Sequence, residues 1–443
     1  MKMLSISRRG FLKHAGACGV ALAAPAIIPA RVFGLGWRAA PGNRVTIGMI
    51  GVGSHGVARN LRGFLAQPDA QIVAVCDVDG GRCRKAQELV NKAYGNNDCA
   101  TYRDFRDILA RSDVDAVMIS TPDHWHVPIA LMAIRAGKDV CCEKPTLTIE
   151  EGRIVSDVVK QTGAIFQTST EDRSLIVYHR MAELVRNKRI GKLQVIRVGL
   201  PGARQAIVPA TPEPVPADFD YEMWLGPAPV APYCAARCHF NFRWIYDYSG
   251  GMLSDWGMHL FDTAQWANDT EHTGPISVAG HGEFPSEGLY NTASMFHLEY
   301  TYANGVKMFV DDGSVGLRFE GTEGWVGNKG WIGPLEASSP EILKSRIGPN
   351  EINLATCFGG EHRNFLDCVK SRRACYFPAE IGHRCATVCH IGNAAMLLGR
   401  KLRWDPVKEE YPDDATANRL RSRAMRAPWA LDQIAPQLQR ERA

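Results

Sequence analysis

The sequence predicts an α/β fold of two domains, a doubly wound parallel sheet followed by an open, mainly antiparallel sheet. Short apolar runs alternate with stretches of helical period up to about residue 165. A glycine-rich turn follows the first of these runs. After residue 165, strand-like runs are joined by short turns and no longer alternate with helices. A chain of 443 residues is long enough for two such domains.

The first domain, predicted over residues 44–165, contains four apolar runs with the length and composition of buried strands. These are residues 45–50, 71–76, 114–121 and 139–142. Stretches of helical period lie between them, at residues 57–67, 82–93, 105–110 and 126–136. Because parallel strands need long crossover connections, this order predicts a parallel sheet with helices on both faces.

The second domain, predicted over residues 166–405, has strands that are not separated by helical crossovers. Strand-like composition occurs at residues 194–199, 276–282, 294–302 and 306–310, with a turn between further strands at 319–326. Ala303-Asn304-Gly305 predicts a tight hairpin, because Asn-Gly tolerates positive φ at both turn positions. Helices are predicted at residues 178–188, 361–370 and 381–398. The Pro- and Ala-rich stretch 203–232 predicts a surface arm, and residues 406–443 a C-terminal tail.

Residues 1–36 have the three parts of an export signal. Arg8-Arg9 lie in a charged segment, residues 15–28 are mildly apolar, and Ala24-Pro25-Ala26 offers small residues for cleavage. The apolar segment is too short to span a membrane. The arginines followed by Phe11-Leu12-Lys13 resemble a twin-arginine signal. We therefore predict recognition by the twin-arginine export machinery, a periplasmic or extracytoplasmic location and no stable membrane insertion.

The excess positive charge of the chain belongs to this leader. Of 51 basic and 47 acidic residues, the leader contains five basic residues and no acidic one, so the remainder is close to neutral. A near-neutral body lacks the basic surface that nucleic-acid binding requires. The 13 cysteines are scattered, and the pairs Cys234/Cys238 and Cys385/Cys389 have no second metal-binding pair beside them. We expect buried free thiols and no metal site.

The glycine-rich turn runs Gly51-Val-Gly53-Ser54-His55-Gly56, between the first apolar run and a predicted helix. The first glycine permits a tight turn, the second lets backbone approach a pyrophosphate, and the third lets helix and strand pack closely. The N-terminus of the following helix offers free N–H groups to the phosphates. The turn, including Ser54 and His55, is therefore a predicted dinucleotide site.

Asp77, at the end of the second apolar run, indicates which dinucleotide this site prefers. A carboxylate at this position accepts from both ribose hydroxyls and repels a 2′-phosphate, which favours NAD. Arg82 and Arg84 follow closely enough along the chain to leave NADP open.

Two patterns predict residues that act on a substrate. Lys144 ends the fourth apolar run, and the carboxyl end of a parallel strand faces the crevice where ligands bind. Asp255 and His259 are four residues apart, so on a helix they share a face. A carboxylate there can orient an imidazole that takes or gives a proton. Lys144, Asp255 and His259 are therefore the predicted catalytic residues.

These motifs, in this order, resemble the Gfo/Idh/MocA oxidoreductases, which include glucose–fructose oxidoreductase and inositol dehydrogenases. The resemblance rests on the leader, the glycine turn, Thr121-Pro122-Asp123-His124-Trp125-His126, Glu143-Lys144-Pro145, and Gly-Gly-x-Leu-x-Asp-x-Gly-x-His-x-x-Asp from Gly250. It covers essentially the whole chain after the leader. It implies an NAD(P)-binding Rossmann domain, followed by a domain that binds substrate and forms a homo-oligomer.

The resemblance also implies roles for single residues. It matches Lys144, Asp255 and His259 to the active-site residues of the family. Asp123 stands where the family usually has Asn. The implied cofactor contacts, beyond the glycine turn and Asp77, are Thr121, Pro122, His124, Trp125, His126, Glu143 and Lys144. The implied substrate contacts are Arg173, Arg243, Asp255 and His259. Tyr178, His179 and His239 are further polar candidates near these segments.

Together these expectations describe an exported enzyme that moves hydride between a sugar or cyclitol carbon and nicotinamide. His259 would remove the hydroxyl proton, Asp255 would hold the imidazole, and Lys144 would hydrogen-bond the same oxygen. A twin-arginine route carries folded proteins, and no free NAD pool exists outside the cytoplasm. The leader therefore predicts a tightly held cofactor.

Two alternatives remain open. Some proteins of this family are redox-neutral, NAD-dependent glycoside hydrolases that act through a transient keto-sugar and often need an additional base, for which Tyr178 and His239 are candidates. The other alternative is a protein that binds a nucleotide or sugar without turnover. The joint presence of Lys144, Asp255 and His259 argues against that alternative.

Overall fold

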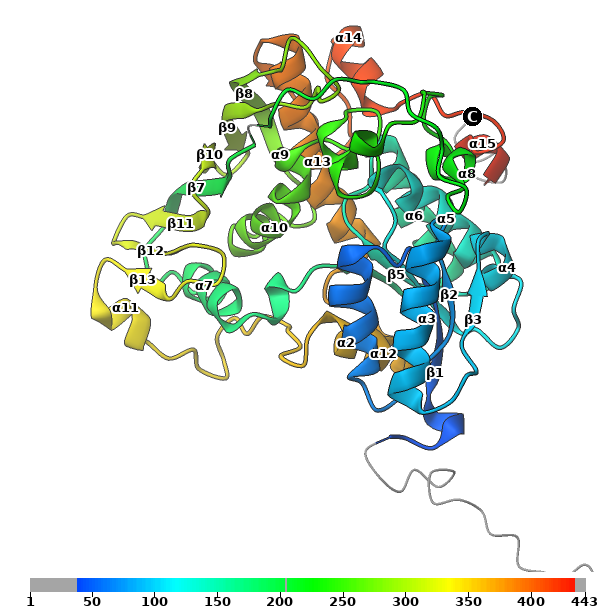
Figure 1. Ribbon diagram of the computed structural model, residues 1–443. Helices are drawn as coiled ribbons and strands as arrows, with labels where there is room; N and C mark the ends of the chain where they lie inside the picture. The colour runs from blue at the N-terminus through cyan, green and yellow to red at the C-terminus, as the bar shows by residue number, and fades with distance from the viewer. Residues whose placement is uncertain (1–37, 204, 435–443) are drawn as a thin grey trace, which may run out of the picture. The chain divides into compact units, whose positions relative to one another are not determined.

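The computed structural model describes residues 38–203 and 205–434 (Figure 1). The predicted leader, residues 1–36, lies outside the described residues. Residues 38–44 contain one 3-10 turn, η2 (Pro41–Asn43), and the chain from Val45 onward forms one compact unit. Among the described residues, no helix combines the length and apolar character needed to cross a membrane.

The first half of this unit is a six-stranded, all-parallel sheet with the order β3-β2-β1-β4-β5-β6. Its strands are β1 (Val45–Ile50), β2 (Ala70–Cys76), β3 (Ala100–Tyr102), β4 (Ala116–Ile119), β5 (Asp139–Glu143) and β6 (Phe166–Ser169). The strand order reverses between β1 and β4, and in such sheets ligands bind beyond the carboxyl ends at this point. The doubly wound parallel sheet is as predicted. The two edge strands, β3 and β6, were not predicted, because they are short and partly polar.

Helices on both faces complete this Rossmann domain (Figure 1). They are η3 (Gly56–Leu61), α2 (Arg62–Leu65), α3 (Gly80–Tyr94), α4 (Phe105–Leu109), α5 (Asp123–Arg135) and α6 (Ile149–Thr162). Local chemistry sets their ends. The side chains of Asp79 and Thr148 cap α3 and α6, and Gly95 and Gly163 end the same helices with φ of 66° and 68°. The helix predicted after the glycine turn begins with a π-helical turn, η3.

The second half is built on an eight-stranded sheet with the order β13-β12-β11-β7-β10-β9-β8-β14. Its strands are β7 (Leu193–Pro201), β8 (Pro275–Glu283), β9 (Met295–Tyr302), β10 (Lys307–Gly313), β11 (Gly316–Gly321), β12 (Trp325–Lys329), β13 (Leu335–Ala337) and β14 (Leu402–Arg403). All neighbours are antiparallel except β7 and β10. The predicted hairpin joins β9 to β10, but only Gly305 has positive φ, because Asn304 folds its amide oxygen back onto the N–H of Val306.

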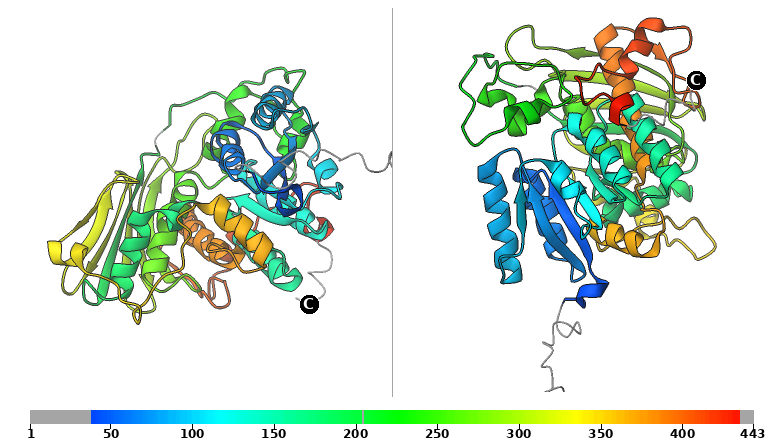
Figure 2. Two further views of the ribbon diagram at one scale, coloured as in Figure 1. Left: turned by 90° about the horizontal axis from the view of Figure 1, so that it is seen from below. Right: turned by 90° about the vertical axis from the view of Figure 1, so that its right-hand side faces the viewer.

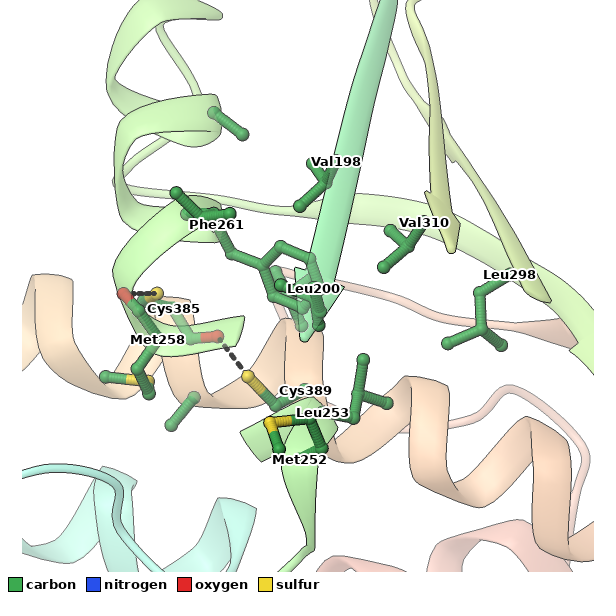
Figure 3. Packing of buried hydrophobic residues seen from close by; sticks show 14 of the residues in the cluster. Val198, Leu200, Met252, Leu253, Met258, Phe261, Leu298, Val310, Cys385 and Cys389 are labelled. Carbon is green, nitrogen blue, oxygen red and sulfur yellow. Dashed lines mark hydrogen bonds between the residues drawn. The ribbon is translucent and has the colours of Figure 1, made fainter. Parts of the chain in front are cut away.

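One face of this sheet is covered by helices (Figures 1 and 2). They are α7 (Ile176–Arg186), α9 (Met252–Asp255), α10 (Gly257–Ala267) and α13 (Ala379–Leu398). Figure 3 shows Phe261 of α10 beside Val198 and Leu200 of β7, and Met258 of α10 beside Cys385 of α13. The Cys385 thiol donates to the carbonyl of Met258 at 3.5 Å. The cysteines of the described residues are free thiols and all but Cys357 are buried, as predicted.

Two segments of the second half return to the Rossmann domain. Helix α12 (Glu361–Ser371) places Phe365, Leu366 and Cys368 in the same apolar cluster as Ile47 and Met49 of β1. The segment predicted as a tail contains α14 (Ala415–Asn418), η7 (Arg419–Arg421) and α15 (Leu431–Ile434). Ile434 is buried against the Rossmann core, so this segment is packed as far as residue 434.

The predicted arm, residues 203–232, lacks regular structure over most of its length. It ends in α8 (Tyr221–Leu225), and the short helices η5 (Ala235–Arg237) and η6 (His239–Trp244) follow. Around residue 218 it runs beside the loop after β2: the N–H of Gly80 donates to Asp218 O, and the N–H of Asp220 donates to Val78 O, both at 2.9 Å. The remaining helices are η4 (Asp172–Ser174), directly after β6, and α11 (Pro340–Lys344).

Candidate functional site

The glycine turn lies at the carboxyl end of β1, as its sequence predicts. Gly51 has φ of 84°, and a Cβ on it would lie 2.5 Å from the carbonyl oxygen of Ser120. A Cβ on Gly56 would lie 2.6 Å from Gly51 O, so the helix can begin close to the strand only without a side chain there. A Cβ on Gly53 would meet only the flexible end of Arg82, at 3.1 Å. The backbone over Gly53 is therefore accessible to a ligand.

A cavity of about 440 Å³ opens at this turn. Its walls include most of the predicted cofactor residues: Gly51, Gly53, Ser54, His55, Gly56, Asp77, Thr121, Pro122, Trp125, His126, Glu143 and Lys144. The second half of the chain contributes Phe219, Met223, Trp224, His239, Phe240, Phe242, Arg243 and Asp255. A concave site with a mainly apolar wall and a few converging polar groups is typical of a small-molecule site.

Asp77 lies at the end of β2 and holds the glycine turn in place. Its carboxylate accepts from the backbone N–H of Val52 at 2.8 Å and of Asp79 at 2.9 Å. Burial raises the pKa of Asp77 to about 6 despite these two bonds. A carboxylate here has lone pairs left for ribose hydroxyls.

Lys144 and Asp255 meet at the floor of the cavity. Lys144 Nζ donates to Asp255 Oδ1 at 2.6 Å and to Asp255 O at 2.9 Å. Arg243 Nε donates to the other carboxylate oxygen at 3.2 Å. Burial lowers the pKa of Lys144, but attraction to Asp255 and Glu143 outweighs it, so the net shift is upward. The amine is therefore a charged hydrogen-bond donor near neutral pH.

His259 is oriented by Asp172 and not by Asp255. His259 Nδ1 lies 2.7 Å from Asp172 Oδ2, and Trp331 Nε1 donates to Asp172 Oδ1 at 3.1 Å. The prediction that Asp255 holds the imidazole is wrong. The reason is a break in the helix: Asp255 ends α9 and His259 belongs to α10, so the two do not share the face of one continuous helix.

Electrostatics agree with this pairing. Burial lowers the pKa of His259, and Lys144 lowers it further, but the charges of Asp172 and Glu171 and the hydrogen bond to Asp172 together make the net shift upward. Burial raises the pKa of Asp172, but the charge of His259 and its hydrogen bond lower it, so the net shift is downward. With Nδ1 bonded to Asp172, Nε2 is the nitrogen left to exchange a proton with a ligand.

Glu143 joins the glycine turn to β5. Its Oε1 lies 2.9 Å from His55 Nε2 and accepts from Asn60 Nδ2 at 2.9 Å. Burial raises the pKa of Glu143, yet the His55 hydrogen bond and the nearby Lys144 lower it to about 2. The carboxylate thus remains ionised beside the cavity.

Models of an oxidoreductase family match most of the chain. A model described as an NAD-binding Rossmann fold matches residues 45–170, and one described as a C-terminal alpha/beta domain matches residues 205–431. The chain belongs to the Gfo/Idh/MocA family.

Known Gfo/Idh/MocA relatives match only part of this chain. A glycosyl hydrolase family 109 protein from Saccharopolyspora erythraea is 37% identical over 163 residues, which is 33% of this chain and 35% of the relative. An alpha-N-acetylgalactosaminidase from Shewanella oneidensis is 32% identical over 180 residues, 36% of this chain and 38% of the relative. The match therefore spans little more than a third of the length of these relatives.

Solved structures are similar over most of their length. An NAD-binding protein from Listeria innocua has a TM-score of 0.60 at 21% identity, covering 81% of this chain and 97% of that one. An aldose–aldose oxidoreductase from Caulobacter crescentus has a TM-score of 0.60 at 16% identity, covering 81% of this chain and 99% of that one. The WlbA dehydrogenase of Bordetella pertussis was solved with NADH and UDP-GlcNAcA. It has a TM-score of 0.62 at 15% identity, covering 82% of this chain and 99% of that one. At these identities the likeness shows the fold alone.

Arg173, which the family resemblance implied as a substrate contact, has a structural role. Its guanidinium donates to both oxygens of Asp262, at 2.7 and 2.8 Å, and to Glu271 at 2.6 Å. It also donates to the carbonyl of Tyr376 at 3.0 Å and does not line the cavity. We therefore correct this prediction: the donors that a substrate would need are already engaged.

His124 is likewise not at the cavity wall. It is 1% exposed, and its Nε2 lies 2.9 Å from the carbonyl of Trp224, so it joins α5 to α8. Burial lowers the pKa of His124 to about 4. The prediction of a cofactor contact at His124 is therefore corrected to a packing role.

His126 and Asp123, the other polar residues of this motif, face the cavity. The two ring nitrogens of His126 lie 2.8 and 2.9 Å from the carbonyls of Pro145 and Thr121, which ties together the loops after β5 and β4. Asp123, in place of the Asn of the family, accepts from Ser249 Oγ at 2.6 Å, and burial raises its pKa to about 6.

Of the three unassigned candidates, only His239 lines the cavity. Tyr178 is fully buried and its hydroxyl donates to the carbonyl of Trp331. His179 Nε2 lies 2.9 Å from the carbonyl of Leu354. Tyr178 and His179 are thus engaged by carbonyl groups of residues far away in the sequence, and such partners cannot be read from the spacing of residues along the chain.

Asp172 is the functional residue that the sequence patterns missed. It follows β6, directly before Arg173, and lies 87 residues before its partner His259. Together with Glu171 the pair presents ligand-type atoms within 4.8 Å of one another. Arg59 Nη2, 3.5 Å from Glu171, supplies a positive partner to that carboxylate, and the neutral N–H of Trp331 donates to Asp172. We therefore infer that Asp172 orients the imidazole of His259.

Proposed function

We propose that this protein is an exported oxidoreductase that transfers hydride between a hydroxyl-bearing carbon of a sugar or cyclitol and a tightly held nicotinamide cofactor. One observation carries the proposal. Lys144, whose ammonium is held by Asp255, lines the cavity that begins at the glycine turn, whereas His259 and Asp172 lie outside the lining of that cavity.

The residues of the Rossmann domain fit a dinucleotide. The N–H groups of the turn 51–56 and the start of η3 would receive the pyrophosphate, because Gly51 and Gly56 leave no side chain in the way. Asp77 would accept from ribose hydroxyls. Bound there, nicotinamide would supply a carbon that accepts or returns hydride.

The protein's own residues manage the proton of the substrate hydroxyl. His259 Nε2 accepts it while Asp172 holds Nδ1–H and stabilises the resulting imidazolium. The Lys144 ammonium donates a hydrogen bond to the same oxygen, which favours alkoxide character as the carbon is oxidised. Asp255 holds Lys144 charged and in place, and Arg243 fixes the second oxygen of Asp255.

Aromatic rings beside His259 support a sugar-like substrate. The rings of Trp256 and Trp331 lie 5.8 and 5.7 Å from the His259 ring, and both side chains are partly exposed. Such rings offer an apolar surface to the C–H face of a pyranose or cyclitol, while its hydroxyls meet Lys144 and His259. The family relatives named for glycosidase and aldose chemistry point to the same substrate class.

The test is hydride transfer by purified protein over a panel of sugars and cyclitols. Lys144→Ala is expected to abolish turnover and to retain the nucleotide, since its ammonium acts on substrate oxygen. Lys160→Ala, an exposed lysine of α6, is the matched control. Full activity in Lys144→Ala would refute the assignment.

A redox-neutral glycoside hydrolase is the second candidate. It is favoured by the relatives named glycosyl hydrolase family 109 and alpha-N-acetylgalactosaminidase. Of the two bases suggested for such a reaction, His239 faces the cavity, whereas the Tyr178 hydroxyl is engaged by Trp331 O. Incubating the protein with aryl glycosides and no added cofactor distinguishes the hydrolase from the oxidoreductase. Release of the aglycone with no net change in nicotinamide absorbance favours the hydrolase.

Export and tight cofactor binding belong together in this proposal. The twin-arginine-like leader at residues 1–36 supports translocation of a folded, loaded protein. An enzyme in that location has to restore its cofactor within the site, either with a second substrate or by returning hydride to the same molecule. Nucleotide that survives extensive dialysis is the expected result, and complete loss on dialysis would count against it.

A further inference from the structure

The arm of the second half forms part of the dinucleotide cavity. Residues 218–220 pair with the loop after β2 through the bonds Gly80 N–Asp218 O and Asp220 N–Val78 O, and Asp79 and Phe219 form the bridge between them. Phe219 is buried and lines the same cavity as Asp77. The arm therefore closes the side of the cavity where Asp77 would meet the adenosine ribose.

Three arginines lie on this side, and each already faces a carboxylate. Arg82 Nε donates to Asp79 Oδ2 at 3.2 Å. Arg84 Nη2 donates to Asp218 Oδ2 at 2.7 Å, and Arg103, which lines the cavity, donates to Asp218 Oδ1. Asp218 of the arm thus engages two guanidinium groups of the Rossmann domain, Arg84 in helix α3 and Arg103 after β3.

The position of Asp218 depends on a glycine. A Cβ on Gly80 would lie 2.3 Å from Asp218 Oδ1, so only glycine there lets the carboxylate sit against the start of α3. The backbone bonds on either side of Asp218 fix the same position. The carboxylate is therefore held by the arm and the loop together, and not by its ion pairs alone.

We propose that Asp218 selects NAD over NADP by occupying Arg84 and Arg103, the guanidinium groups that would otherwise receive a 2′-phosphate. Arginine near the end of β2 is the usual partner of that phosphate, and it binds phosphate with two parallel hydrogen bonds. With Asp218 in place, a 2′-phosphate would meet Asp77, Asp79 and Asp218, and Arg84 and Arg103 would each already donate to the Asp218 carboxylate. This inference rests on the proposed function, since it assumes that the cavity holds a nicotinamide dinucleotide.

The experiment measures which dinucleotide the full-length protein retains. Purified protein is equilibrated with equal concentrations of NAD⁺ and NADP⁺ and desalted, and the retained nucleotides are quantified by mass spectrometry. Asp218→Asn removes the charge and keeps the size of the side chain. It is expected to raise the retained NADP-to-NAD ratio about tenfold.

Two variants serve as controls. Glu213→Gln removes an exposed negative charge from the same arm, and Asp218→Glu keeps the charge at the site. Both are expected to retain the wild-type ratio within twofold. A ratio within twofold of wild type in Asp218→Asn, or an equal shift in Glu213→Gln, would overturn the proposal.

The outcomes also separate this inference from the proposed function. Wild-type protein that retains neither dinucleotide overturns both. A shifted ratio in a protein that oxidises no sugar supports the role of Asp218 and removes only the proposed reaction.

Discussion

Replacing Asp172 by Asn tests which carboxylate serves His259. The substitution keeps the size of the side chain and removes its charge from a fully buried site, 2.7 Å from His259 Nδ1. Asn has one oxygen where Asp172 has two, so it can accept from Trp331 Nε1 or from His259 Nδ1–H but not from each through its own oxygen. The expected loss is therefore one of electrostatic support for the imidazolium and of the hydrogen bond that keeps a proton on Nδ1.

The size of the effect follows from this geometry. A hydrogen bond to a charged group is worth about 1.5 to 3 kcal/mol. Since each 1.36 kcal/mol is tenfold in rate, kcat should fall roughly 10- to 150-fold. Asp172 also raises the pKa of His259, and the base must be neutral to accept a proton. Without that charge the pKa falls, so the acidic limb of the pH profile for oxidation moves to lower pH.

The assay is the pH dependence of kcat and kcat/KM, followed by nicotinamide absorbance with the best substrate of the panel. Asp311→Asn is the matched control, because it alters an exposed aspartate that lies 2.5 Å from His297. That variant should keep the wild-type profile. An acidic limb in Asp172→Asn that stays in place or moves to higher pH would refute the reasoning.

Three further predictions follow from other contacts of the structure. Asp255→Asn removes the charge that raises the pKa of Lys144, so the alkaline limb of kcat/KM should move to lower pH, and an unmoved alkaline limb would contradict the pairing. Arg173→Met leaves Asp262 buried without its partner and should lower the free energy of unfolding by roughly 3 to 5 kcal/mol in urea titrations. A raised KM at wild-type stability would instead restore a substrate role for Arg173. Burial raises the pKa of Glu409, but His383 and Arg153 lower it to about 2. At pH values above 4.5, the ordinary pKa of a glutamate, the ionised carboxylate therefore stabilises the folded protein. This contribution is lost as the pH falls through 2. Glu409→Gln should therefore lower Tm at pH 7, with a difference that shrinks between pH 4.5 and 2, and an equal Tm at pH 7 would argue against the pairing.

The sequence was sufficient wherever one local pattern decides the structure. Gly51 after β1, Asp77 after β2 and Lys144 after β5 all lie at strand ends, and a parallel sheet brings strand ends together. The hairpin at Gly305 follows from a backbone conformation that glycine adopts readily.

Prediction failed where partners come from distant segments. The i, i+4 spacing of Asp255 and His259 suggested a pair, but the helix break between them gives each a different partner, Lys144 and Asp172. Arg173 had no pattern to show that Asp262 and Glu271 would engage it. These contacts depend on how β6, α9 and α10 pack, and that information is not in the spacing of any one segment.

Helix α12 has a consequence for the biosynthesis of this protein. Its Phe365 and Leu366 belong to the apolar cluster around β1, although more than 300 residues separate them along the chain. Until the ribosome has made this helix, one face of the nucleotide-binding sheet has part of its apolar surface uncovered. The packing of this face of the sheet is therefore completed only after most of the chain has been synthesised. A fragment ending near residue 170 would lack its own closing helix, so the first domain in sequence order is among the last to be completed.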